Sequence, residues 1–258
     1  MSLAASTRSL NNAAMHKKTH VATFLLALLC CMSIGFSAVS LPPIFGDHAV
    51  LQRDIELPVW GTAGAGEKVT VTIAGKSASA TADDQGNWSL KLPSLKKGEA
   101  TSMTITGEHD NPIVLHDLLV GDVWICSGQS NMGFLTREAS DAAKELAAAK
   151  HPDIRLFNVD HVTSINPTKD FKGEWKVCTP KSAADFSAVG YFFGRDINNL
   201  EDVPVGLINN SWGGMPAESF TSEQKLQSDP DFKPLLDRRA DAMKPGMVAQ
   251  RIKASRRA

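Results

Sequence analysis

A serine in a glycine-containing turn is the residue of this sequence best placed to do chemistry. The segment SGQSNM, at residues 127–132, follows the apolar run VWIC and precedes residues that favour a helix. In open α/β sheets, ligands and nucleophiles lie in loops beyond the carboxyl ends of the strands. A serine there attacks a carbonyl group if a base removes its proton and N–H donors stabilise the oxyanion. From the pattern alone, Ser130 also fits a turn residue or a helix N-cap.

Strands and helices alternate around this turn. Residues 118–128 form an apolar run typical of a buried strand, and residues 140–150 are rich in helix formers. Further strands are predicted at residues 154–159 and 205–212, with a helix at residues 190–200. This alternation predicts an α/β fold in which helices flank a parallel sheet.

The preceding part of the chain has a different rhythm. Short alternating segments predict strands at residues 57–60, 68–75, 77–82, 88–92 and 101–106, separated by Gly, Asp, Asn and Pro turns. Such spacing is typical of a small antiparallel β-sandwich. We therefore predict a sandwich domain at residues 41–117 and an α/β domain at residues 118–258.

The first forty residues predict a leader with a signal peptide. A basic pair precedes the uncharged run at residues 21–36, and small residues follow it. Cleavage after Ser37 or after Ser40 would satisfy the small-residue rule, while a retained anchor is the alternative. The expectation is export to the periplasm or the extracellular space, with no stable membrane association after cleavage.

Composition narrows the partners and cofactors. With 27 Lys and Arg against 28 Asp and Glu, the net charge is -1, so no basic field indicates a nucleic-acid partner. The sequence has no CxxC, HExxH or phosphate-binding loop, so neither a metal nor a cofactor is expected. Cys126 is expected to be a buried free thiol, with a disulfide to Cys178 as the alternative.

Several segments in the correct order resemble the sialate O-acetylesterase family of the SGNH (GDSL-like) hydrolases. They are PPIFGDHAVLQRD at 42–54, LPVWG at 57–61, SGQSNM at 127–132, AVGYFFGRDI at 188–197 and GLINNSWGGMPAES at 206–219. The resemblance implies an SGNH-type fold and hydrolysis of O-acetyl esters on sialic acid or related glycans. An acetylated carbohydrate is then the expected substrate, and no oligomeric state is predicted.

The same resemblance assigns roles to individual residues. It implies that Ser130 is the nucleophile and that the backbone N–H groups of Ser130 and of Gly213 or Gly214 stabilise the oxyanion. Glycine suits that place because the backbone can approach a ligand closely. Gln129 and Asn131 are the candidate substrate-binding residues beside the nucleophile.

The sequence departs from the family in its catalytic acid and base. The family carries them in a D-x-x-H segment that follows a WYQGES-like run, and this sequence contains neither. We therefore expect a chain truncated at its carboxyl end, with an incomplete sheet. His151 and His161 are expected to be surface loop residues rather than the base. Gly133 and Met215 stand where the family usually has an acidic residue and a threonine.

Two other functions remain open. The chain could be a catalytically inactive fragment whose sandwich binds carbohydrate or a partner through Trp60 or Trp88, although each tryptophan fits a core position better. Alternatively, the same chemistry could deacetylate xylan or another polysaccharide, because a fold and a nucleophile do not fix the substrate.

Overall fold

The computed structural model describes residues 38–99, 101–109, 111–162, 168, 171–244 and 246–247. The predicted signal peptide falls on residues 1–37, outside the described residues, and so do the basic residues 248–258. Within the described ranges, no helix is both long and apolar enough to cross a membrane.

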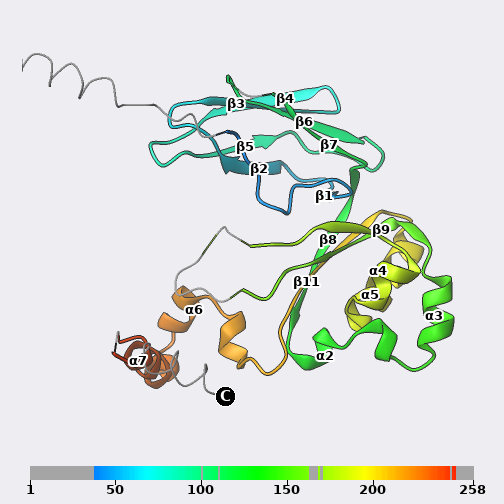
Figure 1. Ribbon diagram of the computed structural model, residues 1–258, viewed down its shortest axis with the longest axis vertical. Helices are drawn as coiled ribbons and strands as arrows, with labels where there is room; N and C mark the ends of the chain where they lie inside the picture. The colour runs from blue at the N-terminus through cyan, green and yellow to red at the C-terminus, as the bar shows by residue number, and fades with distance from the viewer. Residues whose placement is uncertain are drawn as a thin grey trace, which may run out of the picture.

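Two small antiparallel sheets form the amino-terminal part of the molecule (Figure 1). One sheet pairs β2 (Leu57–Thr62) with β5 (Asn87–Leu92), and the other has the order β4 (Lys76–Thr81), β3 (Lys68–Ile73), β6 (Ser102–Thr106), β7 (Ile113–His116). Apolar side chains alternate along β2, β3, β5 and β6, so one face of each sheet is buried. Val59, Val71, Trp88 and Ile105 belong to the resulting core.

A larger five-stranded sheet carries the serine turn. Its order is β1 (Val50–Gln52), β8 (Leu119–Gly128), β11 (Val205–Ser211), β9 (His151–Asn158), β10 (Trp175–Cys178). The strands β8, β9 and β11 confirm the predictions from the sequence. The first four strands of this order run parallel, so β8 and β11 end at the same edge of the sheet.

The prediction of a purely parallel sheet is wrong at β10, which runs antiparallel to β9. The strand is held there by Trp175, whose ring contacts Phe157 at a centroid distance of 5.2 Å and whose Nε1 donates to the carbonyl of Ile44 at 2.8 Å. The chain therefore returns along β9 instead of crossing over through a helix, and the sheet is mixed.

The short strand β1 is a second difference from the sequence prediction. It belongs to the segment that we assigned wholly to the sandwich, yet Val50–Gln52 pairs with β8 in the larger sheet. Val50 and Leu51 are buried at this junction. Three residues are too few for a periodic pattern, so the sequence gave no signal for this pairing.

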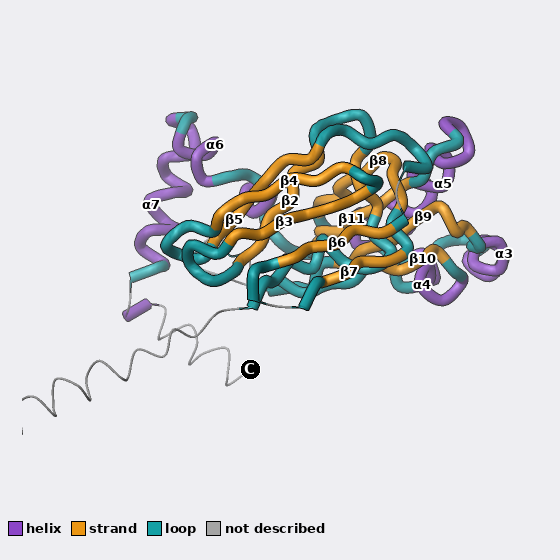
Figure 2. The backbone as a smooth tube through the Cα atoms, turned by 90° about the horizontal axis from the view of Figure 1, so that it is seen from above, coloured by secondary structure: helices purple, strands orange, loops and turns teal. Residues whose placement is uncertain are grey.

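Helices α3 (Ala142–Ala148), α4 (Pro180–Ala184) and α5 (Ala188–Glu201) cover one face of the larger sheet (Figure 1). Helix α5 lies very close to β11 because an added Cβ at Gly194 would approach Leu207 Cδ1 to 2.5 Å. Helices α6 (Glu223–Gln227) and α7 (Lys233–Ala242) lie together at the opposite end of the molecule (Figure 2).

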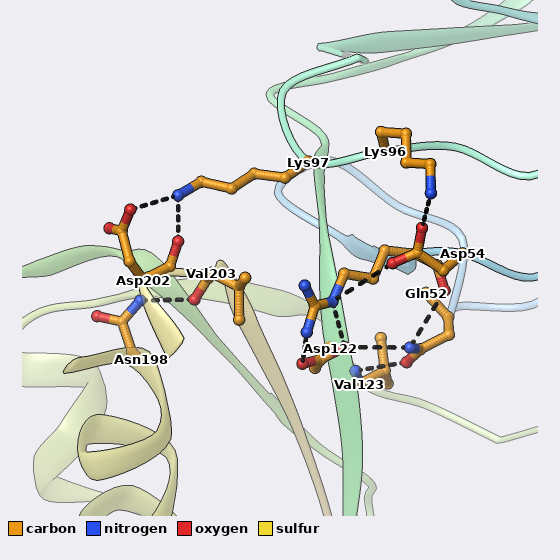
Figure 3. A network of polar contacts seen from close by, with 10 residues as sticks. Gln52, Asp54, Lys96, Lys97, Asp122, Val123, Asn198, Asp202 and Val203 are labelled. Carbon is orange, nitrogen blue, oxygen red and sulfur yellow. Dashed lines mark hydrogen bonds and ion pairs between the residues drawn. The ribbon is translucent and has the colours of Figure 1, made fainter. Parts of the chain in front are cut away.

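Polar contacts tie the small sheets to the larger one (Figure 3). The guanidinium of Arg53 donates to both carboxylate oxygens of Asp122 in β8, at 2.9 and 3.0 Å. After β5, Lys96 forms an ion pair with Asp54, and Lys97 reaches Asp202 at the end of α5 at 2.8 Å. The two parts of the chain therefore meet through specific contacts rather than through a bare linker.

The structure also places the cysteines and tryptophans. Cys126 is a buried free thiol, as predicted, and Cys178 is also free and buried. Burial raises the pKa of both thiols, that of Cys178 to about 12, so both are protonated at neutral pH. Trp88 lies in the core as expected, whereas the core prediction for Trp60 is wrong because this residue is 37% exposed.

Candidate active site

Ser130 lies at the carboxyl end of β8, as the first residue of the short helix α2 (Ser130–Gly133). The turn before it needs glycine, because Gly128 has a φ of +145°. The backbone N–H of Trp212 donates to the Gly128 carbonyl at 2.9 Å and holds the turn against β11. The Ser130 side chain is exposed and makes no hydrogen bond with any residue in the described ranges.

Gly213 lies against Ser130. Ser211, the last residue of β11, pairs with Gly128, so the SWGG turn follows β11 directly beside the serine turn. A Cβ added to Gly213 would lie 3.7 Å from both Cα and Cβ of Ser130. The backbone N–H groups of Ser130 and Gly213 donate no hydrogen bond to a described residue, which leaves both available to a ligand.

A cavity of about 440 Å³ opens at this point. Ser130 and Gly213 both line it, so the structure brings together two of the predicted site residues. Gln129, Asn131 and Gly214 are exposed and do not line this cavity. Gly214 has a φ of +77° and open space around it, which fits a turn position. The arrangement can offer a hydroxyl and two N–H donors to one carbonyl group.

A row of polar side chains forms another part of the cavity and was not predicted. Ser211 Oγ donates to Asn209 Oδ1 at 2.7 Å, and Asn209 Nδ2 donates to Asn158 Oδ1 at 2.9 Å. Asn158 Nδ2 in turn donates to the backbone carbonyl of Asp185 at 3.2 Å. The row fixes the amide groups beside Ser130, and such preorganised dipoles are suited to orienting a polar substrate.

Each histidine that we predicted to be a surface loop residue has a more definite place. His151 begins β9 and is half-buried beside the Tyr191 hydroxyl, away from the cavity, so its assignment to a loop is wrong. Burial, followed by the charge of Arg195, lowers the pKa of His151. His161 does lie in a loop, but it lines the same cavity as Ser130.

His161 supports the turn that carries Gly213. Its ring stacks on Trp212 with a centroid distance of 4.3 Å and an interplanar angle of 8°. Its Nε2 lies 2.8 Å from the Ser211 carbonyl, and because a carbonyl only accepts, Nε2 carries the hydrogen. His161 thus contacts the two residues that immediately precede Gly213, and it is placed to position the turn.

We expect His161→Ala to lower kcat for ester hydrolysis by about 10- to 100-fold with little change in KM, because small displacements of catalytic groups are costly. His161→Phe retains a ring on Trp212 and should lose less activity than the alanine variant. Steady-state kinetics on an acetyl ester measures both. Equal and near-complete inactivation of both variants would instead identify His161 as the base, and unchanged kinetics would contradict any role.

Comparison with known proteins places this arrangement among esterases. No protein-family model matches the chain. The chain is 30% identical over 214 residues to the sialate O-acetylesterase of Rattus norvegicus, covering 76% of this chain and 39% of that protein. It is 28% identical to the human sialate O-acetylesterase over 76% of this chain and 40% of the relative.

A solved structure shows the same similarity in three dimensions. The crystal structure of a carbohydrate acetylesterase from Xanthomonas citri superposes with a TM-score of 0.71 at 37% sequence identity. The alignment covers 74% of this chain and 44% of that protein. The chain therefore spans about two fifths of the length of the curated relatives it matches.

Proposed function

The chain belongs to the SGNH-like esterase family of the sialate O-acetylesterases, and from this premise we propose that it removes O-acetyl groups from carbohydrates with Ser130 as the nucleophile. One observation carries the proposal. Ser130 and Gly213, from turns that follow two neighbouring parallel strands, meet in one cavity of about 440 Å³. This is the place where such sheets bind ligands.

The proposed reaction is acyl transfer. Ser130 Oγ attacks the acetyl carbonyl as its proton passes to a base, and the sugar hydroxyl leaves with a proton to give an acetyl-serine. The backbone N–H groups of Ser130 and Gly213 stabilise the oxyanion of the tetrahedral intermediate. Water then attacks the acetyl-serine, acetate leaves, and Ser130 regains its proton. The base remains a prediction from the family, in which a D-x-x-H segment supplies it.

One feature of the cavity favours a neutral polysaccharide, such as acetylated xylan, over sialic acid. Its lining includes the carboxylates Glu138 and Asp185 but neither lysine nor arginine among the described residues. Asp185 already forms an ion pair with Arg137. A sialic acid carboxylate bound here would lack a cationic partner, whereas the amides of Asn158 and Asn209 suit uncharged hydroxyl groups.

The experiment is a direct comparison of substrates. The full chain is incubated with O-acetylated sialic acid and with O-acetylated xylan, and the released acetate is measured. The proposal predicts release above a protein-free control, faster from xylan. No release from either substrate would contradict the proposed function, and faster release from sialic acid would contradict the preference for a neutral sugar.

We also propose an SGNH-type α/β domain from residue 118 onward and a β-sandwich between residues 41 and 117. The proposal rests on the mixed sheet with helices on one face and on the two small antiparallel sheets before it. The contribution of β1 to the larger sheet means that the boundary is not a simple cut between two independent units.

We propose that the protein is exported and that its signal peptide is cleaved after Ser37 rather than after Ser40. Val39 is buried, and Ser40 exchanges two backbone hydrogen bonds with Thr62, at 2.8 and 3.0 Å. Cleavage after Ser40 would remove all of these contacts. We expect the mature protein secreted by a bacterial host to begin at Ala38, as read by amino-terminal sequencing. A start at Leu41, or an uncleaved cytoplasmic protein, would contradict this.

A further inference from the structure

We propose that a second carbohydrate-binding site, separate from the candidate active site, lies beside Trp60 on β2. A cavity of about 330 Å³ opens where the chain at residues 40–43 crosses this strand. The size lies at the lower end of the range for ligand pockets and suits a small ligand. Nothing in the proposed esterase reaction uses this cavity.

The Trp60 ring is both exposed and held in place. It is 37% exposed, and Phe45 packs against it at a centroid distance of 4.7 Å and an interplanar angle of 76°. Its indole N–H makes no hydrogen bond with a residue that the structure describes. A fixed indole offers a flat apolar face and one N–H donor at low entropic cost, which matches a sugar ring with its C–H face and hydroxyl groups.

Two hydroxyl groups stand in the same cavity. Ser40 Oγ and Thr62 Oγ1 lie 2.8 Å apart at the surface, and each keeps further capacity to donate or accept hydrogen bonds. The backbone bonds between Ser40 and Thr62 fix both groups. The crossing itself requires Gly61, because an added Cβ there would approach the Ser40 carbonyl oxygen to 2.2 Å. The hydroxyl pair is therefore built into the backbone arrangement.

The lining selects the chemical class of the ligand. The remaining walls come from Pro42, Pro43 and Phe171, and the lining residues include no charged side chain. An anionic ligand such as a nucleotide or a sialylated glycan would find no cation here. An aromatic ring, apolar walls and hydroxyl groups fit a neutral sugar unit.

The position suits a polymeric substrate. Phe171 also lines an apolar cavity of about 220 Å³, and Val159 lines both that cavity and the one that contains Ser130. The three cavities therefore adjoin one another. A glycan held at Trp60 would stay close to the active site while its acetyl groups are removed.

The test measures binding without turnover, in the full chain carrying Ser130→Ala. Isothermal titration calorimetry with xylohexaose and cellohexaose, both neutral and unacetylated, is expected to detect binding of at least one. Adding Trp60→Ala should raise Kd by about 10-fold or more. Trp124→Ala, which removes another exposed tryptophan outside this cavity, is the matched control and should leave Kd unchanged.

A second variant guards against misfolding. Ser40→Ala combined with Thr62→Val removes both hydroxyls, keeps the backbone bonds, and should also weaken binding. Trp60→Ala in the otherwise unchanged chain should leave hydrolysis of a small acetyl ester unaffected, so failure here is distinct from failure of the esterase proposal. Absence of binding to both oligosaccharides, or binding that Trp60→Ala does not weaken, would overturn the site. Equal Trp60-dependent binding of anionic hexagalacturonate would overturn the preference for neutral sugars.

Discussion

Replacing Ser130 with alanine is expected to abolish acyl transfer by this protein. The variant loses the only nucleophile proposed for the cavity, and the loss of a catalytic serine costs about 10³-fold or more in kcat. The assay is release of p-nitrophenol from p-nitrophenyl acetate, whose leaving group departs without being protonated. This readout therefore depends on Ser130 and the oxyanion donors more than on a general acid.

Ser127→Ala is the matched control for this change. Ser127 belongs to the same turn, but its hydroxyl donates to the carbonyl of Asn210 at 3.3 Å, and it does not line the cavity. We expect this variant to keep most of its activity. Equal rates for the unchanged protein and Ser130→Ala, with Ser127→Ala also unaffected, would show that Ser130 is not the nucleophile.

The largest expected loss of stability comes from Asp117→Asn. Asp117 accepts hydrogen bonds from the guanidinium of Arg155 at 2.6 and 3.2 Å, and Arg155 is only 3% exposed. Removing the partner of a buried charge typically costs 3–5 kcal/mol, and the half-exposed Asp117 side chain reduces this to roughly 2–3 kcal/mol. The midpoint of urea unfolding at neutral pH measures the change.

The same pair makes a pH-dependent contribution to stability. Hydrogen bonds from Arg155, and then from His48, lower the pKa of Asp117 from its ordinary value of 3.8 to about 2. Because the folded pKa is the lower one, the stabilisation is fully present above about pH 4 and is lost as pH falls toward 2. The difference in unfolding free energy between the unchanged protein and Asp117→Asn should therefore narrow over this range.

Asp84→Asn is the control for the stability prediction. Asp84 is an exposed carboxylate in the turn before β5, and its replacement should leave the unfolding midpoint nearly unchanged. A midpoint for Asp117→Asn equal to that of Asp84→Asn, or a difference that persists unchanged down to pH 2, would contradict the role assigned to the Asp117–Arg155 pair.

The parts of the fold that could be predicted are those with a long local pattern. The apolar run before SGQSNM is long enough to identify β8, and the glycine-spaced run at residues 188–197 lies within α5. The strands β1 and β10 have three and four residues, and their places depend on partners far away in the sequence. Propensity carries little information at that length.

The site divides in the same way. Ser130 and Gly213 follow predicted strands, and the structure places them together. Asn158 and Asn209 could have been found as a pair, because they occupy equivalent positions near the ends of two predicted parallel strands. His161 could not, because it lies in an irregular loop, and only the folded chain brings its ring onto Trp212.

The central claim is that Ser130 is the nucleophile of an esterase site, and covalent labelling tests it most directly. The full chain is treated with a fluorophosphonate, which reacts with activated serines, then digested and sequenced by tandem mass spectrometry. The account predicts one adduct, on the peptide that contains Ser130, and its loss in Ser130→Ala. An unlabelled Ser130 in protein that hydrolyses acetyl esters, or an adduct on another serine, would contradict it.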